Sequence, residues 1–182
     1  FINGKSQGKR TKDLTKTVHN TGSKESQEAF ERQQRYRLMW MDTKYEPGTV
    51  KVVAYDENGK AVAEKEIRTA GKPHRIELSA DRSELSANGK DLSFINVRVV
   101  DKDGNLIPDA TNQIEFKVKG AGSYRAAANG NSVSLELFHH PRMKLFSGQL
   151  TAIVQSGDKA GEITFEATTK GLKGAKLKIV TK

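Results

Sequence analysis

The chain has 182 residues, no cysteine and a formal net charge of +9. Without cysteine a disulfide framework is excluded, and no apolar run approaches the roughly 20 residues of a membrane-spanning helix. The positive charge raises nucleic-acid binding as a hypothesis, but no helix-turn-helix, zinc-finger or RNA-recognition signature accompanies it. Most basic residues alternate with apolar ones, as on solvated sheet faces, so we expect neither nucleic acid nor a membrane as a partner.

The first residues, Phe1–Lys5, have the pattern of a strand end followed by an Asn-Gly hairpin turn. A strand that precedes this turn is therefore implied, and we expect the chain to be a fragment whose first domain is incomplete at its N-terminus. The residues that follow, about 9–35, are polar and basic with few apolar anchors. They predict a long loop with at most one helical turn.

The stretch from Tyr36 to Arg68 contains three short apolar runs separated by clusters of turn-forming residues. It predicts a strand over Tyr36–Asp42, a corner at Glu46-Pro47-Gly48, and a hairpin that turns at Asn58-Gly59. Val50, Val52 and Ala54 alternate with their neighbours in the first hairpin strand. This period of two predicts one buried face.

Trp40, the single tryptophan, has two interpretations. A tryptophan in a central strand of a β-sandwich is usually part of the core, which is the interpretation we favour. Aromatic rings also stack on sugars, so the alternative is a carbohydrate site. Its candidate stacking platforms are Trp40, Tyr36, Tyr45 and Tyr124.

A second unit follows the linker-like residues Thr69–Pro73, which gives predicted domains at 1–72 and 73–182. Gly48 and Gly161 begin similar strand patterns 113 positions apart (161 minus 48), which is about one small β domain. Residues 120–132 are rich in Gly, Ala and Asn and predict a loop. The predicted strands are His74–Ala80, Leu92–Val100, Gln113–Val118, Val133–Phe138, Gln149–Gln155, Ala160–Ala167 and Ala175–Val180.

Two clusters invite a metal-site hypothesis. The Asp101–Asn105 run is acidic, but its Gly104 stands at the fourth position and not at the sixth that an EF-hand loop requires, so we predict a turn. His139 and His140 are adjacent and would point to opposite faces of an extended chain, which makes joint ligation difficult. We predict a surface loop there, broken by Pro141. No catalytic, cofactor-binding or metal-ligating residue is predicted anywhere in the chain, and no cofactor.

The motifs resemble two domains of known enzymes. Phe1–Gly8, Arg37–Trp40 and Tyr45–Asp56 look like the non-catalytic immunoglobulin-like domain after the barrel of bacterial beta-galactosidases in glycoside hydrolase family 2. The second unit, at Ile76–Leu78, Asp91–Phe94, Val97–Pro108 and Gly161–Val180, is similar to their C-terminal invasin-like domain, especially in Bacteroides-type bacteria. The resemblance implies an all-β chain of two tandem immunoglobulin-like β-sandwich domains, the first of them N-terminally incomplete.

The resemblance also implies a function. The family's enzymes are retaining glycosidases with two carboxylates, but their Asn-Glu acid/base motif does not occur in this sequence, so we expect the fragment itself to be no enzyme. It would be a non-catalytic accessory region of a periplasmic or extracellular beta-galactosidase that supports the catalytic barrel of the same parent chain or its oligomer and substrate contacts. Galactose-containing glycans are a further candidate partner. The alternatives are a carbohydrate-binding module and an adhesin-like spacer.

Overall fold

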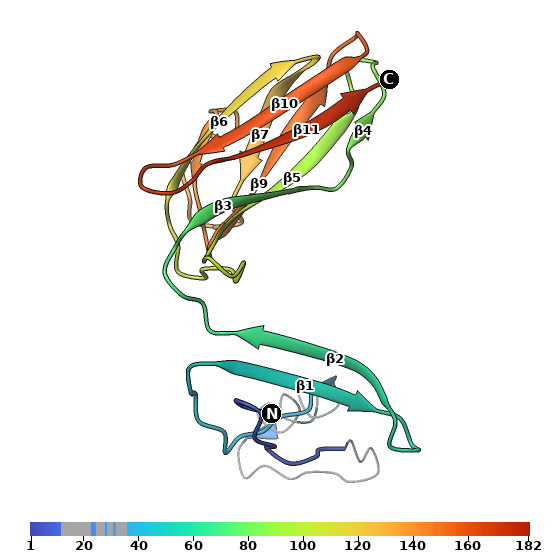
Figure 1. The fold of residues 1–182 in the computed structure, drawn as a ribbon, viewed down its shortest axis with the longest axis vertical. Coiled ribbons are helices and arrows are strands. Elements are labelled where there is room, and N and C mark those ends of the chain that lie inside the picture. The colour runs from blue at the N-terminus through green and yellow to red at the C-terminus, as the bar shows by residue number, and fades with distance from the viewer. Residues whose placement is uncertain (12–22, 25–27, 29–30, 32–35) are drawn as a thin grey trace. The chain divides into compact units, whose positions relative to one another are not determined.

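The computed structural model describes residues 1–11, 23–24, 28, 31 and 36–182, and the elements defined in these residues are eleven strands (Figure 1). Every element defined in the described residues is a strand, which confirms the all-β prediction for this part of the chain. The chain divides into two compact units, Phe1–Thr69 and Ala70–Lys182. Most of the predicted loop at 9–35 lies outside the described residues.

The first unit is organised by an antiparallel hairpin of β1 (Thr49–Tyr55) and β2 (Ala61–Arg68). In the turn between them, the Asp56 carboxylate accepts hydrogen bonds from the backbone N–H groups of Asn58 (3.0 Å) and Lys60 (2.8 Å). Gly59 has a φ of 79°, a conformation that glycine adopts without steric cost. This hairpin and its turn were predicted correctly.

Two predictions for the first unit are wrong. Tyr36–Asp42 is not a strand, because no described residue supplies a neighbouring strand for it to pair with. The hairpin face with Val50 and Val52 is not buried, since these side chains are 42% and 51% exposed and their neighbour Ile67 is 66% exposed. A face of a sheet is buried only by a second layer, and the described part of this unit contains none.

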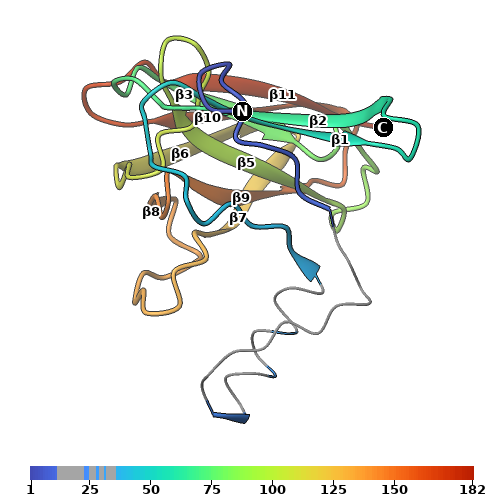
Figure 2. The same cartoon turned by 90° about the horizontal axis from the view of Figure 1, so that it is seen from below.

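The second unit is a sandwich of two sheets (Figures 1 and 2). One sheet has the order β4-β11-β10-β6-β8 and the other the order β3-β5-β9-β7. This order matches the A-B-E-D sheet and the opposing G-F-C sheet of immunoglobulin-like domains. The strands are β3 (Arg75–Ala80), β4 (Glu84–Leu85), β5 (Leu92–Val100), β6 (Gln113–Gly120), β7 (Gly122–Ala128), β8 (Arg142–Lys144), β9 (Gln149–Ser156), β10 (Gly161–Thr168) and β11 (Ala175–Thr181).

The core of the second unit lies between the two sheets. Alternate residues of β5 and β10 point into it, and Phe165 at its centre is 0% exposed. The Phe165 ring stacks on Phe116, which in turn stacks on Tyr124, each with ring centroids 5.7 Å apart. Every buried apolar residue among those described belongs to this unit, so it has a hydrophobic core of its own.

The sequence correctly predicted β3, β5, β6, β9, β10 and β11, but two predictions for this unit are wrong. Residues 120–132 are not simply a loop, because they contain β7. Val133–Phe138 is not a strand, and β8 was missed. The glycine and alanine in β7 serve close packing: a Cβ on Gly122 would lie 2.4 Å from Cδ1 of Ile163 in the opposite sheet.

Candidate functional site

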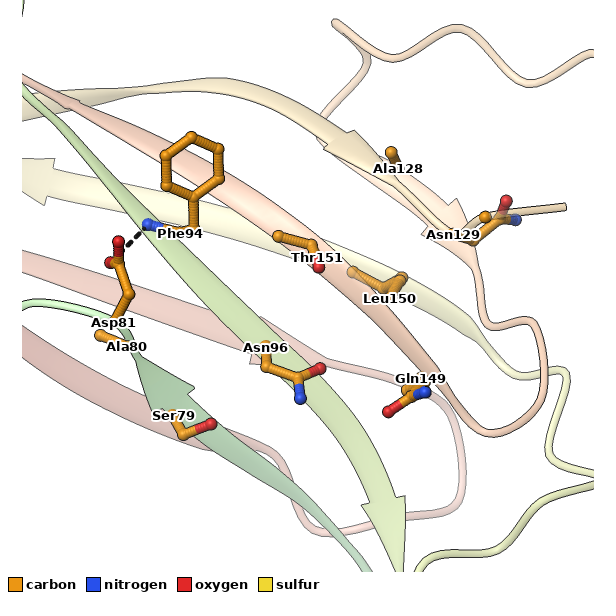
Figure 3. Close-up of a pocket in the computed structure, with 11 residues that line it drawn as sticks. Ser79, Ala80, Asp81, Phe94, Asn96, Ala128, Asn129, Gln149, Leu150 and Thr151 are labelled. Atoms are coloured by element: carbon orange, nitrogen blue, oxygen red, sulfur yellow. Dashed lines mark hydrogen bonds between the residues drawn. The ribbon is translucent and has the colours of Figure 1, made fainter. Parts of the chain in front are cut away.

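A shallow groove of about 670 Å³ lies on the outer face of the four-stranded sheet (Figure 3). Its one aromatic ring is that of Phe94, which is 44% exposed. Most of the other side chains are short and polar or amide-bearing, so the groove can offer both a flat apolar surface and hydrogen bonds. The lining residues are Ser79, Ala80, Asp81, Phe94, Asn96, Ala128, Asn129, Gly130, Gln149, Leu150 and Thr151.

The register of the sheet places one row of residues directly across the groove. Ser79 pairs with Asn96, Asn96 with Thr151, and Thr151 with Ala128, so the row crosses all four strands. The residues between them along each strand point into the core, as Ile95 and Ala152 do. The alternation of the strands thus produces the groove and the core together.

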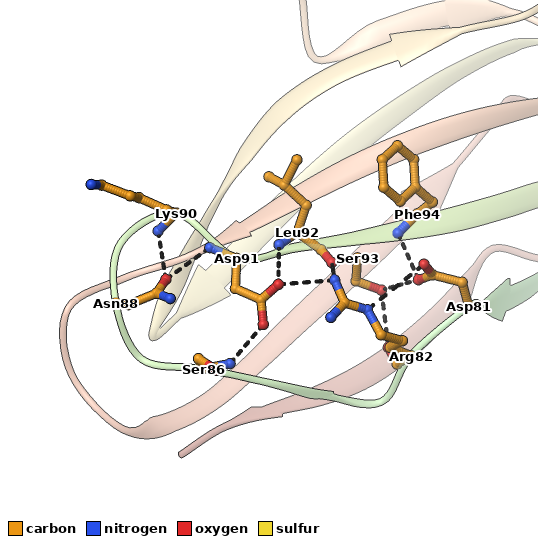
Figure 4. A network of polar contacts seen from close by, with 9 residues as sticks. All are labelled: Asp81, Arg82, Ser86, Asn88, Lys90, Asp91, Leu92, Ser93 and Phe94. Atoms are coloured by element: carbon orange, nitrogen blue, oxygen red, sulfur yellow. Dashed lines mark hydrogen bonds and ion pairs between the residues drawn. The ribbon is translucent and has the colours of Figure 1, made fainter.

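Asp81, which directly follows β3, is hydrogen-bonded to the backbone of β5 at Phe94 (Figure 4). Its carboxylate accepts hydrogen bonds from the Phe94 backbone N–H (2.8 Å) and the Ser93 hydroxyl (3.1 Å). Burial by itself would raise the pKa of this carboxyl, but these hydrogen bonds outweigh it and hold the pKa below its usual value. Asp81 is therefore ionised at neutral pH and acts as an acceptor that orders the strand.

Asp91, like Asp81, is a carboxylate that accepts hydrogen bonds from nearby protein groups (Figure 4). It accepts hydrogen bonds from the Ser86 backbone N–H (2.8 Å) and from the Arg82 guanidinium (2.9 Å), which hold its pKa below the usual value. The Arg82 guanidinium also donates to the Leu92 carbonyl. These two carboxylates have protein donors on them and depressed pKa values, whereas a general acid at neutral pH needs a raised pKa.

The aromatic residues proposed from the sequence do not line this groove. Tyr36 and Tyr45 are exposed, at 72% and 75%. Tyr124 is half-buried, its hydroxyl donates to the carbonyls of Phe138 (3.0 Å) and His140 (2.7 Å), and burial raises the pKa of Tyr124 to about 12. Its ring packs on the core and is unavailable as a flat platform.

Trp40 is half-buried, so the prediction that it lies in a core is wrong. Its indole N–H donates to the Gly8 carbonyl (3.0 Å), which ties the first residues of the unit to this segment.

The sequence analysis did not single out Phe94, although the sequence contains a signal for it. Phe94 and Ile95 are consecutive apolar residues in an alternating strand, so one of them must face outward.

In the acidic turn after β5, hydrogen-bond donors of the protein stabilise the charged carboxylate of Asp101. The Asp101 carboxylate is 2% exposed and accepts hydrogen bonds from the backbone N–H groups of Gly71, Asp103 and Asn105 and from the Asn105 amide, at 2.8–2.9 Å. The Gly71 bond first, then the Asn105 side chain, holds the pKa of Asp101 well below its usual value. The predicted turn is confirmed, and the carboxylate is occupied by protein donors.

The two histidines lie in a turn before β8, and their rings make an edge contact with centroids 4.7 Å apart. The expectation that they point to opposite faces is wrong, because the chain is not extended there. No group of three or more potential metal-ligating side chains occurs in the described residues. Within the same residues, no helix has the length and apolar character to cross a bilayer.

The strand order of its two sheets makes the second unit an immunoglobulin-like β-sandwich domain. Residues 76–178 match the profile of the glycoside hydrolase family 2 C-terminal domain 5, and residues 1–63 match a domain of unknown function. The chain belongs to the family of glycoside hydrolase family 2 C-terminal domains. The resemblance inferred from the sequence is confirmed.

The relatives are much longer proteins. The chain is 46% identical over 179 residues to a beta-galactosidase of Bacteroides ovatus, covering 98% of this chain and 19% of that protein. A crystal structure of a family 2 glycosyl hydrolase from Bacteroides cellulosilyticus is 34% identical with a TM-score of 0.72, covering 77% of this chain and 18% of that one. A beta-glycosidase from Bacteroides vulgatus is 26% identical with a TM-score of 0.72, covering 75% and 18%. The chain spans about a fifth of these relatives.

Proposed function

We propose that this chain is a non-catalytic C-terminal accessory region of a beta-galactosidase and that it supports the catalytic barrel of the same polypeptide. The observation that carries the proposal is the 46% identity along 98% of the chain to a beta-galactosidase of Bacteroides ovatus. A periplasmic or extracellular location, which the family resemblance implies, is part of the proposal.

The hydrogen bonds and the lowered pKa values of three carboxylates support a non-catalytic role. A retaining glycosidase needs a protonated acid and a free nucleophilic carboxylate about 5–5.5 Å apart. Asp81, Asp91 and Asp101 instead accept hydrogen bonds from protein donors and have depressed pKa values. A rigid sandwich with its own core can brace a neighbouring domain, because the covalent connection keeps it at a high effective concentration.

Deletion tests the proposal. We expect the full-length parent enzyme to hydrolyse galactosides and the 182-residue chain alone to hydrolyse none. The parent without this region should lose activity at a lower temperature, because the barrel loses its support. Activity of the isolated chain, or a shortened enzyme with unchanged kinetics and heat resistance, would show that the proposal is wrong.

One observation favours a second function, carbohydrate binding at the groove. Sugar rings present C–H groups on one side and hydroxyls around the edge, so they bind where a flat ring is combined with amides and hydroxyls. Phe94 supplies the ring, and Asn96, Gln149 and Thr151 supply the polar groups. The proposed glycan contact therefore belongs to the second unit, and Trp40 is not among the residues that line it.

A matched pair of phenylalanine variants tests glycan binding. Phe94 and Phe146 are both 44% exposed, but only Phe94 lines the groove. We expect Phe94→Ala to weaken binding to soluble galactan about tenfold, which corresponds to about 1.4 kcal/mol, and Phe146→Ala to leave it unchanged. Affinity electrophoresis of the 182-residue chain measures both. No retardation of the unmodified chain, or equal effects of the two variants, would exclude the groove.

A further inference from the structure

The connection between β7 and β8, residues 129–141, exposes four large apolar side chains and is called the apolar loop below. Val133 is 80% exposed, Leu135 95%, Leu137 53% and Phe138 61%. Figure 2 shows this connection, in orange, projecting from the sandwich. Monomeric proteins rarely expose contiguous apolar patches larger than a few hundred Å², and such patches often mark binding sites.

In the apolar loop the apolar side chains are more exposed than the polar side chains between them. Ser134 and Glu136 alternate with the apolar residues and are the partly buried ones. The Glu136 carboxylate accepts a hydrogen bond from the Lys144 backbone N–H (3.1 Å), and the Ser134 hydroxyl accepts one from the Glu136 N–H (3.3 Å). The segment therefore turns its polar side chains toward its own domain and its apolar side chains outward.

The ends of the apolar loop are held firmly. The Asn129 side chain donates to the Lys144 carbonyl (3.0 Å), and the Ala127 N–H donates to the Phe138 carbonyl (2.8 Å). The Tyr124 hydroxyl adds bonds to the carbonyls of Phe138 and His140. These hydrogen bonds already order the ends of the apolar loop in the free domain. Docking of its apolar side chains on a partner therefore requires little further loss of conformational entropy.

We propose that the apolar loop docks on an apolar surface of the rest of the parent polypeptide, outside the region corresponding to residues 1–182. This inference rests on the proposed accessory function and specifies the contact that it uses. The Bacteroides ovatus relative aligns with this chain over only 19% of its length, so about four-fifths of such a protein lies outside the region and can provide the surface.

The size of the patch favours a contact within one polypeptide over a second copy of the chain. The exposed fractions of the four side chains correspond to on the order of 500 Å². A stable interface between separate proteins buries about 800 Å² on each partner, whereas a covalently tethered contact needs less because the tether supplies effective concentration. Two copies meeting at this loop would also bring together the exposed Arg142 and Lys144 of each.

The test compares one pair of substitutions in two proteins. Val133→Gln with Leu135→Gln in the full-length parent enzyme should lower the temperature of heat inactivation by roughly 3–5 °C and increase proteolytic cleavage within the loop. In the 182-residue chain the same pair should leave the unfolding midpoint unchanged, because the two side chains are 80% and 95% exposed there. Leu135→Met, which keeps an apolar side chain at this position, should leave the parent's heat resistance unchanged, and so should Phe146→Gln at an exposed site outside the loop.

The outcomes separate this inference from the proposed function. A lowered unfolding midpoint in the 182-residue chain would mean that the loop stabilises its own domain, and the docking inference would be wrong. An unaffected full-length variant, in a parent that deletion of the whole region does destabilise, would keep the accessory function and overturn the docking site. Loss of a dimer in the full-length variant would make a second copy the occupant and would also overturn it.

Discussion

Replacing Phe165 by alanine is expected to destabilise the second unit by about 3–5 kcal/mol, the usual cost of removing a large buried aromatic side chain. Phe165 is 0% exposed and stacks on Phe116 between the two sheets. Its removal leaves a cavity that paired strands on both sides keep from closing. Since small domains are stable by only about 5–15 kcal/mol, a large part of the fold's stability is lost.

Urea unfolding followed by circular dichroism measures this change. Phe146→Ala, at a site that is 44% exposed, is the matched control and should cost less than about 1 kcal/mol. Phe165→Leu should fall between the two because it leaves a smaller cavity. Equal midpoints for Phe165→Ala and Phe146→Ala would contradict the assignment of Phe165 to the centre of the core.

Asp101→Ala is expected to cause the second large loss of stability. It removes the acceptor of four hydrogen bonds, one of which binds Gly71 before β3. Backbone N–H groups left without a partner in a buried turn are costly, so the midpoint of urea unfolding at pH 7 should fall clearly. The exposed Asp109 provides the control, and Asp109→Ala should leave the midpoint nearly unchanged.

The Asp101 carboxylate also makes the stability of the second unit depend on pH, in a direction that follows from its pKa. The folded-state pKa of Asp101 lies below the unfolded value of about 3.9, so the folded protein binds fewer protons. Its stabilisation is therefore complete above the unfolded pKa and is lost as pH falls toward the folded pKa. The unmodified chain should lose stability from about pH 5 downward, and Asp101→Asn should show a shallower decline. Parallel curves for the two proteins would exclude this role.

Sequence periodicity predicted the strands that combine alternation with clear turns. Leu92–Val100 was predicted with its observed bounds because Gly89 and the acidic turn at Asp101 punctuate it. β7 was missed for a physical reason: glycine and alanine are uncommon in strands, but here they allow the sheets to approach, as Gly122 does beside Ile163. Close approach depends on residues distant in sequence, which a local pattern does not contain.

Alternation also misled the prediction at Val133–Phe138. The period of two is present, but it specifies only that alternate side chains share a side. Whether that side faces the core or water depends on which residues the fold brings near, and here the polar Glu136 faces the domain because the Lys144 N–H is its partner. The groove could not be predicted from the sequence for the same reason. It is made by four strands, and their order in the sheet follows from long-range pairing.

The lengths of the outermost strands determine how this domain can meet other chains. The five-stranded sheet ends in β4 and β8, which have two and three residues, and β7 at one edge of the other sheet has a register shift between Tyr124 and Ala126. Short or irregular edges give an incoming strand few consecutive backbone groups to pair with, which protects a β-protein from edge-to-edge aggregation. Three of the four sheet edges of this domain therefore disfavour the addition of a strand from another chain, while β3 forms the fourth edge.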